Sequence, residues 1–181
     1  MRERSHTETQ AGIRLREDFF LRDVLNVAPD LIGKYIVICK IGNICRYLIT
    51  ETEAYRGEED KACHASRGRT PRTEVMYGKG GRIYVYFVYG MYWMLNSVTS
   101  NENDPQAVLI RGVEGISGPG RLTRELGIDR TYYGEDLSAS ARIWVEDAGI
   151  EPVIKVGPRV GIQYSGDEWI TKPWRYQAKL K

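Results

Sequence analysis

Residues 83–98, IYVYFVYGMYWMLNSV, decide the fold class of this 181-residue chain. Residues 83–88 and 91–98 are rich in β-branched and aromatic side chains, and Tyr89-Gly90 lies between them. Two such segments around a short turn predict a pair of antiparallel strands. This hairpin is the first sign of an antiparallel sheet.

Tyrosine is concentrated in this hairpin. The chain has 12 Tyr against 3 Phe, and five of the tyrosines fall between residues 77 and 92. Since side chains alternate along a strand, Tyr84 and Tyr86 share one face, while Val85 and Phe87 take the other. A buried tyrosine hydroxyl needs a polar partner, so this row predicts a partly wet aromatic surface on which flat rings stack. Core packing is the competing interpretation.

The segments outside the hairpin predict more strands than helices. Strands are expected at residues 35–39, 44–50, 107–111, 143–145, 153–156 and 159–162, with Gly42-Asn43 joining the first two. Helical patterns cover residues 18–33, interrupted at Pro29, and residues 119–127. Because hairpins dominate, we predict an α+β fold with an antiparallel β core flanked by short helices.

Length and composition favour one domain and exclude several classes of protein. The length suits a single domain over residues 12–181, preceded by a flexible polar tail at residues 1–11. Cys39, Cys45 and Cys63 form no C-x-x-C pair, which argues against a disulfide framework or a structural zinc site. No apolar run reaches about 18 residues, so we expect a soluble intracellular protein without a membrane span.

The formal net charge of +2 hides a local asymmetry. Residues 51–60 hold five acids and one base, whereas residues 67–82 hold five bases and one acid. Residues 155–181 hold six bases and two acids. This pattern is compatible with a basic face that meets phosphates around a recessed acidic spot, and solvated surface charge is the alternative.

The acidic segment carries the best candidate for acid–base chemistry. In ETEAY, residues 51–55, alternation places Glu51, Glu53 and Tyr55 on one face of a strand. A carboxylate at the floor of a pocket can activate a water, which makes Glu53 a candidate general base; exposed acids on an edge strand are the alternative. Metal-dependent and Ser-His-Asp hydrolysis are not expected, because the sequence has no H-E-x-x-H or G-x-S-x-G motif.

Two further features point to contacts at the surface. The segment SGPGRL, residues 117–122, precedes the second predicted helix. Free backbone N–H groups at a glycine-rich helix start suit a phosphate, and a plain turn is an equal alternative. Tyr89 lies at the tip of the predicted hairpin, where an aromatic side chain is poorly placed for a core.

Taken in chain order, the blocks ETEAY, KACHASRG, TPR, IYVYFVYGMYWMLN, AVLIR and SGPGRL resemble the alkyladenine (3-methyladenine) DNA glycosylase family. The closing blocks PRVGI, EW and KPWRY are similar to that family too, so the resemblance spans residues 18–176. It implies an enzyme that flips an alkylated or deaminated purine out of duplex DNA and hydrolyses the N-glycosidic bond, leaving an abasic site without strand cleavage.

The resemblance also implies the setting of this reaction. The expected partner is double-stranded DNA that contains a damaged purine of the 3-methyladenine class, with hypoxanthine as a further candidate. No cofactor, metal or membrane is implied, and we expect a monomer. The protein would act in the cytoplasm with the nucleoid of a prokaryote, or in the nucleus of a eukaryote. The fold would be similar to the C-terminal domain of methionyl-tRNA formyltransferase.

Site roles follow by matching this chain to the family motifs, position by position. Glu53 matches the water-activating base and Arg111 the arginine that helps to hold the water. The base pocket would be formed by Tyr55 and His64, which sandwich the base, by Tyr86 beside it, and by Asn96, which crowds the exocyclic amine of normal guanine. Tyr89 matches the wedge that fills the gap in the DNA stack. Backbone contacts are expected from Arg72, Gly118, Gly120 and Arg121.

One departure from the family and two alternatives stay open at this stage. Only residues 112–116 separate Arg111 from Ser117, a shorter connection than members of the family usually carry. A non-catalytic nucleic-acid-binding module is the first alternative, although it has no reason to keep Glu53, His64 and Arg111 together. A helix-hairpin-helix glycosylase, suggested by residues 118–120, is the second, and it predicts a mostly helical protein.

Overall fold

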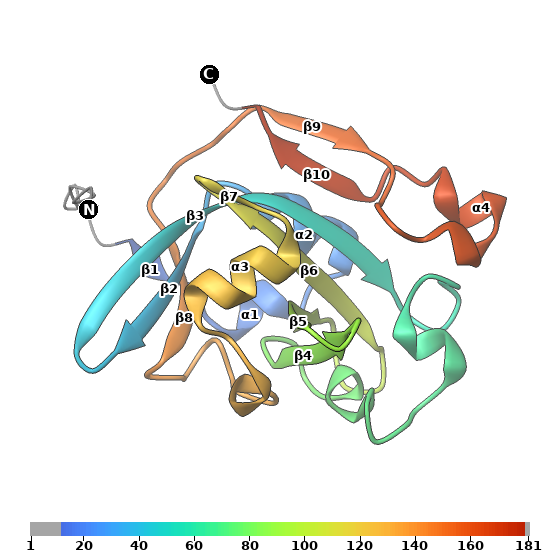
Figure 1. Cartoon of the computed structure of the whole chain (residues 1–181), viewed down its shortest axis with the longest axis horizontal. Coiled ribbons are helices and arrows are strands. Elements are labelled where there is room, and N and C mark those ends of the chain that lie inside the picture. The colour runs from blue at the N-terminus through green and yellow to red at the C-terminus, as the bar shows by residue number, and fades with distance from the viewer. Residues whose placement is uncertain (1–11, 180–181) are drawn as a thin grey trace.

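The computed structural model describes residues 12–179, in which a ten-stranded sheet runs through the molecule (Figure 1). The strands are β1 (Ile13–Arg14), β2 (Tyr35–Lys40), β3 (Asn43–Arg56), β4 (Ile83–Val88), β5 (Tyr92–Thr99), β6 (Gln106–Val113), β7 (Ile116–Ser117), β8 (Ile143–Asp147), β9 (Ile154–Gly157) and β10 (Arg175–Ala178). The α-helices are α1 (Glu17–Phe20), α2 (Val24–Asp30), α3 (Pro119–Leu126) and α4 (Asp167–Ile170). Four 3₁₀ turns lie at η1 (His64–Arg67), η2 (Glu74–Tyr77), η3 (Arg130–Tyr132) and η4 (Gln163–Ser165).

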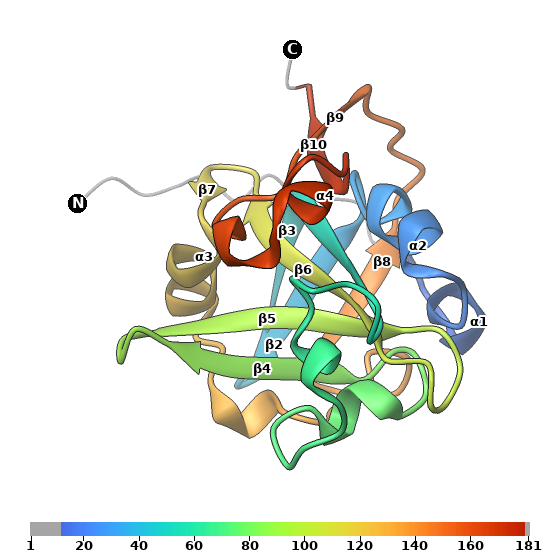
Figure 2. The same cartoon turned by 90° about the vertical axis from the view of Figure 1, so that its right-hand side faces the viewer.

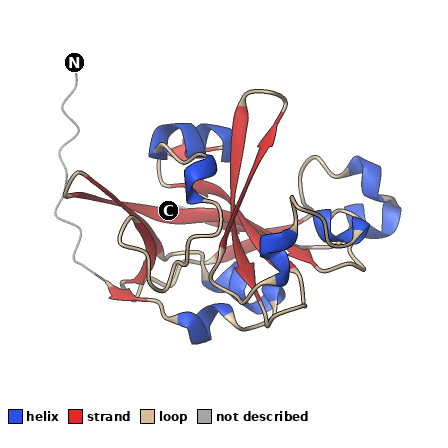
Figure 3. Cartoon of the chain, turned by 90° about the horizontal axis from the view of Figure 1, so that it is seen from below, coloured by secondary structure: helices blue, strands red, loops and turns tan. Residues whose placement is uncertain are grey.

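Every strand pairing among the described residues is antiparallel. The strand order is β1-β8-β2-β3-β6-β5-β4, with β7 added to β6, and β10 linking β3 to β9. Strands fill the middle of the molecule and the short helices lie around its outside (Figure 3). The α+β prediction is therefore confirmed, and the helix-dominated alternative is wrong.

Strand β3 organises the site because it belongs to two parts of the sheet. Its first half, residues 43–48, pairs with β2, and its second half pairs with β6 on one side and β10 on the other. The register shifts between Ile49 and Thr52, a bulge of the kind that bends a strand and re-aims side chains. The acidic segment thus lies in the interior of the sheet rather than on an edge.

Two helices cover the sheet close to this strand. α2 packs against β3 and β6, while α3 packs against β5 and β6. Asp23 caps α2, accepting the Leu25 N–H at 2.9 Å. As predicted, α3 starts with a proline in its first turn and ends at Gly127, whose φ of 62° is readily adopted by glycine. None of the helices in residues 12–179 has the length and apolar character of a membrane span.

The β4–β5 hairpin projects from the body with its turn free at the left-hand edge of Figure 2. Val88 pairs with Tyr92, so the turn consists of Tyr89, Gly90 and Met91 and is one residue longer than predicted. The φ angles of Tyr89 and Gly90 are 54° and 66°. Two successive left-handed residues are typical of tight hairpin turns, and glycine or asparagine usually fills the first position. Tyr89 holds that position here at a steric cost.

Three sequence-based element predictions are wrong. The helical region of residues 18–33 is broken at residues 21–23. α2 continues through Pro29 to Asp30, although Pro29 has no N–H to donate to the carbonyl of Leu25. The β2–β3 turn is Ile41-Gly42 rather than Gly42-Asn43, since Asn43 pairs with Lys40. Residues 159–162 form no strand, because Arg159 and the backbone of Val160 bind side chains of the site.

The chain ends contain two unpredicted strands, β1 and β10, and two undescribed segments. β10 was missed because its RYQA sequence has little β character, yet it pairs with β3 beside the acidic residues. The prediction of a flexible tail at residues 1–11 lies outside the described residues, as do residues 180–181. Residues 12–179 contain one large hydrophobic core and a smaller aromatic cluster next to it.

Candidate active site

Glu53 is a buried carboxylate with no exposed surface. Its Oε1 accepts the backbone N–H of Val160 at 2.8 Å, and its Oε2 accepts the hydroxyl of Tyr55 at 2.9 Å. The Nε of Arg111 lies 3.4 Å from Oε1. These contacts come from β3, β6 and the segment before η4, so the interpretation of this residue as an exposed acid on an edge strand is wrong.

Glu53 is one of four charged residues that we call the charge cluster: Glu51, Glu53, Arg111 and Arg175. The Oε1 atom of Glu51 accepts the Nε of Arg111 at 3.0 Å and the Nε of Arg175 at 2.6 Å. Two carboxylates and two guanidiniums balance formally to zero. The predicted sharing of one strand face by Glu51, Glu53 and Tyr55 is borne out by these contacts.

Burial raises the pKa of Glu53 above its ordinary value of 4.5. Arg111, the N–H of Val160 and the hydroxyl of Tyr55 oppose this effect, and the negative charge of Glu51 adds to it. A carboxylate with a raised pKa binds a proton more readily than an exposed one, which suits a general base. The pKa of Glu53 is therefore the result of burial opposed by one cation and two hydrogen-bond donors.

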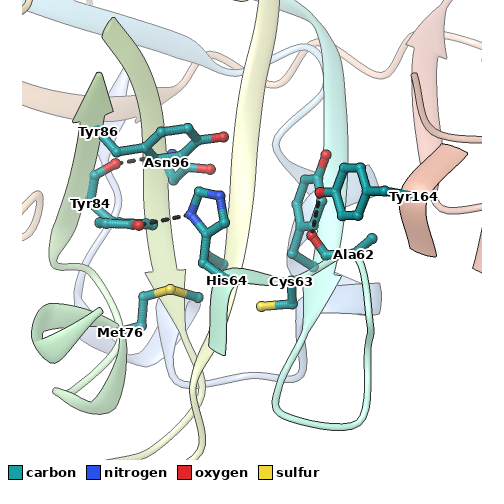
Figure 4. Close-up of a pocket in the computed structure, with 10 residues that line it drawn as sticks. Ala62, Cys63, His64, Met76, Tyr84, Tyr86, Asn96 and Tyr164 are labelled. Atoms are coloured by element: carbon teal, nitrogen blue, oxygen red, sulfur yellow. Dashed lines mark hydrogen bonds between the residues drawn. The ribbon is translucent and has the colours of Figure 1, made fainter. Parts of the chain in front are cut away.

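An aromatic cavity, drawn in Figure 4, adjoins the charge cluster through Tyr55, which lines the cavity and donates to Glu53. Its lining residues are Tyr55, Ala62, Cys63, His64, Met76, Tyr84, Tyr86, Asn96, Ala107 and Tyr164. The structure thus brings together the four predicted base-pocket residues. The cavity volume is about 40 Å³. Tyr164, at 68% exposure, is the most exposed lining side chain, and its hydroxyl donates to the backbone oxygen of Ala62 at 3.1 Å.

His64 forms one wall of this cavity and is held by tyrosines of β4. Its Nδ1 lies 2.8 Å from the hydroxyl of Tyr84, and its ring meets that of Tyr86 edge-on at 4.5 Å. Burial, with the nearby Arg72 and Arg67, lowers the pKa of His64 to about 4. The imidazole is therefore neutral at neutral pH and offers a flat, uncharged surface.

Tyr55 connects the aromatic cavity to the charge cluster. Its ring lines the cavity and its hydroxyl donates to Glu53, while the guanidinium of Arg159 lies 4.8 Å from the ring centre. Arg159 pairs with Asp60 at 2.5 Å, and neither side chain has exposed surface. Because residue 159 precedes Val160, this ion pair also fixes the N–H that binds Glu53.

Asn96 and Arg72 lie around the same cavity. Asn96 is buried, and its Nδ2 donates to the backbone oxygens of Tyr84 at 3.0 Å and Met94 at 3.3 Å, which fixes the amide plane. The guanidinium of Arg72 lies 5.2 Å from the ring centre of Tyr86 at the exposed side. Arg72 was predicted only as a contact to the DNA backbone, and the structure places it beside a residue that lines the cavity.

The other predicted residues lie apart from the cavity. Tyr89, at the β4–β5 turn, is 87% exposed. Gly118 and Arg121 lie at the start of α3, where Gly118 has open space around it and a φ of 94°. Gly120 is buried, and a Cβ atom there would lie 2.7 Å from the ring of Tyr92, so close packing alone accounts for this glycine.

Sequence reasoning missed several residues that the fold brings to the site: Arg175 in the charge cluster, Asp60 and Arg159 behind Tyr55, the backbone of Val160, and Tyr164. The PRVGI block was a usable signal for two of them. No three His, Cys, Asp or Glu side chains in residues 12–179 gather in a way that could hold a metal ion.

Comparisons with known proteins agree with this arrangement. The family model described as methylpurine-DNA glycosylase (MPG) matches residues 18–118 and 114–181. The two matched segments meet at the tight β6–β7 turn, where the connection is short.

Relatives from distant organisms are similar over most of their length. A protein of Psychrobacter cryohalolentis is 42% identical over 87% of this chain and 90% of its own. Proteins of Methanocella arvoryzae and Rickettsia felis are 42% and 44% identical, each over 91% of this chain and 92% of their own. All three are named as candidate 3-methyladenine DNA glycosylases. The chain belongs to the methylpurine-DNA glycosylase family.

Proposed function

We propose that this protein is a DNA repair glycosylase that removes alkylated purines of the 3-methyladenine class from duplex DNA. The observation that carries the proposal is the buried Glu53, which has a raised pKa and is bonded to a tyrosine of an aromatic cavity. The family of the chain and the names of its relatives support the same reaction. A binding module without catalysis would gain nothing from a buried, destabilising carboxylate.

The damaged nucleotide has to leave the base stack before it can enter the cavity. We infer that its base lies between Tyr55 and His64, beside Tyr86, and that Tyr89 fills the gap left in the duplex. An alkylated purine often carries a positive charge, which strengthens stacking on electron-rich rings. The neutral state of His64 avoids repulsion of that charge.

The chemical step transfers the purine's sugar from nitrogen to water. Glu53 takes a proton from a water that Arg111 helps to hold, and the water oxygen forms a bond to C1′. The C1′–N bond breaks with its electron pair going to the base, so a cationic alkylated purine leaves as a neutral molecule. A neutral lesion such as hypoxanthine needs a proton at the leaving group as well.

Contacts to the DNA backbone complete the proposal. Arg72 and Arg121 are exposed cations, and Gly118 leaves open space at the start of α3. Each is suited to a phosphate by charge or by free backbone N–H groups. Gly120 is the weakest of the four candidates because its packing on Tyr92 already explains it.

The direct test is release of a single 3-methyladenine or 7-methylguanine from a labelled duplex. We expect free base and an abasic site that breaks only after alkali, and no DNA–protein adduct after borohydride, because no lysine takes the role of Glu53. Glu53→Gln should bind the lesion and lose about 10²- to 10⁴-fold in release rate. Binding without release by the wild-type protein would overturn the proposal in favour of a non-catalytic module.

A further inference from the structure

The charge cluster contains two side chains to which the proposed reaction gives no task, Glu51 and Arg175. We propose that they are positioning residues which hold Arg111 between two carboxylates and so set how strongly Glu53 takes up the proton of the attacking water. This inference rests on the proposed function. Glu53 stays the proposed base, and Glu51 and Arg175 act only on its affinity for a proton.

Arg111 is shared unequally between the carboxylates. Its Nε is 3.0 Å from Glu51 and 3.4 Å from Glu53, so the nearer partner is not the proposed base. The side chains of Arg111, Glu51 and Glu53 are 14%, 9% and 0% exposed, which leaves little solvent to screen their charges. Each carboxylate therefore competes directly for the same guanidinium.

Arg175 moderates this competition from the other side. Its Nε lies 2.6 Å from the same Glu51 oxygen that accepts from Arg111. Among the ion pairs of residues 12–179, Arg175 pairs with Glu51 and not with Glu53. Arg175 thus satisfies part of the charge of Glu51 and reduces its pull on Arg111.

An intermediate degree of pairing is what a buried general base needs. A guanidinium that pairs fully with a carboxylate lowers the pKa of that carboxylate, which then accepts a proton poorly. A buried carboxylate without any cation is protonated near neutral pH and cannot act as a base. Glu51 weakens the pairing of Arg111 with Glu53, and Arg175 limits this effect because it satisfies part of the charge of Glu51.

Removal of Glu51 should therefore lower the pKa of Glu53, and removal of Arg175 should raise it. Other groups face Glu53 from neighbouring elements: Tyr55 from β3, Tyr86 from β4, and the N–H of Val160 from the segment before η4. The guanidinium of Arg159 lies behind them, over the ring of Tyr55. These groups are the same in both variants. The difference between the variants consequently isolates the sharing of Arg111.

The experiment is the single-turnover rate of base release against pH, with enzyme in excess over a duplex that carries one 7-methylguanine. In Glu51→Gln, Arg111 can pair fully with Glu53. The acidic limb of the pH–rate profile, where the rate falls as Glu53 is protonated, should then move to lower pH by about one unit. The rate on the plateau above this limb should fall about tenfold, because Glu53 becomes a weaker base. Arg175→Gln should move the limb to higher pH by a similar amount. Arg175→Lys keeps the charge and should return the limb towards its wild-type position.

Glu146→Gln is a matched control, because Glu146 is a buried carboxylate paired with Arg46 at 2.7 Å in another part of the sheet. It should lower the melting temperature and leave the limb in place. The inference is overturned if both cluster variants lose activity with an unmoved limb, or if both limbs move in the same direction. Should Glu51→Gln not fold, the pair Arg175→Gln and Arg175→Lys decides the question.

Failure of the underlying function has a different signature. If Glu53→Gln releases base as fast as the wild-type protein, Glu53 is not the base and the proposed function falls. If Glu53→Gln is inactive and the limb of the cluster variants does not move, only the role of Glu51 and Arg175 is refuted.

Discussion

Glu53 and Tyr89 sit in opposite surroundings within one small protein. Glu53 has no exposed surface, and its two oxygens accept bonds from Val160 and Tyr55 beside the guanidinium of Arg111. Tyr89 is 87% exposed on the β4–β5 turn and adopts a backbone conformation that tyrosine rarely takes. The proposed chemistry thus lies at a buried, fully bonded residue, and the proposed contact with the DNA stack lies at an exposed one.

This contrast fits what each step requires. Proton transfer depends on fixed distances and a low local dielectric, which a packed interior provides. Entry into a duplex requires a side chain that no protein neighbour already occupies. A strained, exposed residue costs stability, and such residues are often retained for function.

Breaking the buried Arg159–Asp60 pair should have the largest effect, on stability. Arg159→Met leaves the carboxylate of Asp60 buried without its cation, which costs about 3–5 kcal/mol of unfolding free energy. Urea denaturation followed by tryptophan fluorescence measures this loss. Arg69→Met, at the exposed pair with Glu74, is the matched control and should unfold like the wild-type protein.

Removal of the wedge should affect flipping and leave the chemistry intact. Tyr89→Ala should slow release from a paired lesion by about 10- to 100-fold, because unstacking a base costs a few kcal/mol. The same variant should act at the wild-type rate on a lesion that is already unpaired. An equal loss on both substrates would show that the turn also supports the chemical step.

The pH dependence of release should follow Glu53 alone. Because the pKa of Glu53 is raised, the rate should start to fall at a pH above 4.5 as the carboxylate is protonated, about tenfold per pH unit. His64, whose pKa is lowered to about 4, should add a change only at still lower pH. His64→Gln should keep the acidic limb in place, and a displaced limb would assign the titration to the imidazole.

Relief of backbone strain at the β4–β5 turn should give the smallest effect on stability, and this effect should be a gain rather than a loss. Tyr89→Asn replaces a residue at a φ of 54° by one that tolerates this conformation, and should raise stability by about 1 kcal/mol while slowing release. Ile41→Asn is the matched control at the β2–β3 turn, where φ is 48°. It should give a similar gain in thermal stability without a change in release.

The exposed turn could be predicted from the sequence, and so could part of the buried site. Alternation along a strand put Glu51, Glu53 and Tyr55 on one face, and the Tyr89-Gly90 turn followed from the two flanking β-rich segments. Both signals are local, because they depend on residues a few positions apart. The family resemblance added the roles of Arg111 and His64, which spacing alone did not give.

The rest of the charge cluster could not be predicted, because its partners lie far apart in the chain. Arg175 binds Glu51 across 124 residues, and Arg159 binds Asp60 across 99 residues. Charged residues in a polar tail are usually exposed, so no hydrophobic pattern marked Arg159 as buried or Arg175 as a partner of Glu51. The predicted strand at residues 159–162 failed for the same reason, since its backbone and side chains bind distant groups.

The most direct test of the contrast is a crossed experiment with Glu53→Gln and Tyr89→Ala on a paired and a pre-unpaired lesion, measured as single-turnover base release. We expect unpairing to restore the rate of Tyr89→Ala and to leave Glu53→Gln inactive, because one residue opens the duplex and the other performs the chemistry. Recovery of Glu53→Gln on the unpaired lesion, or no recovery of Tyr89→Ala, would contradict this division of tasks.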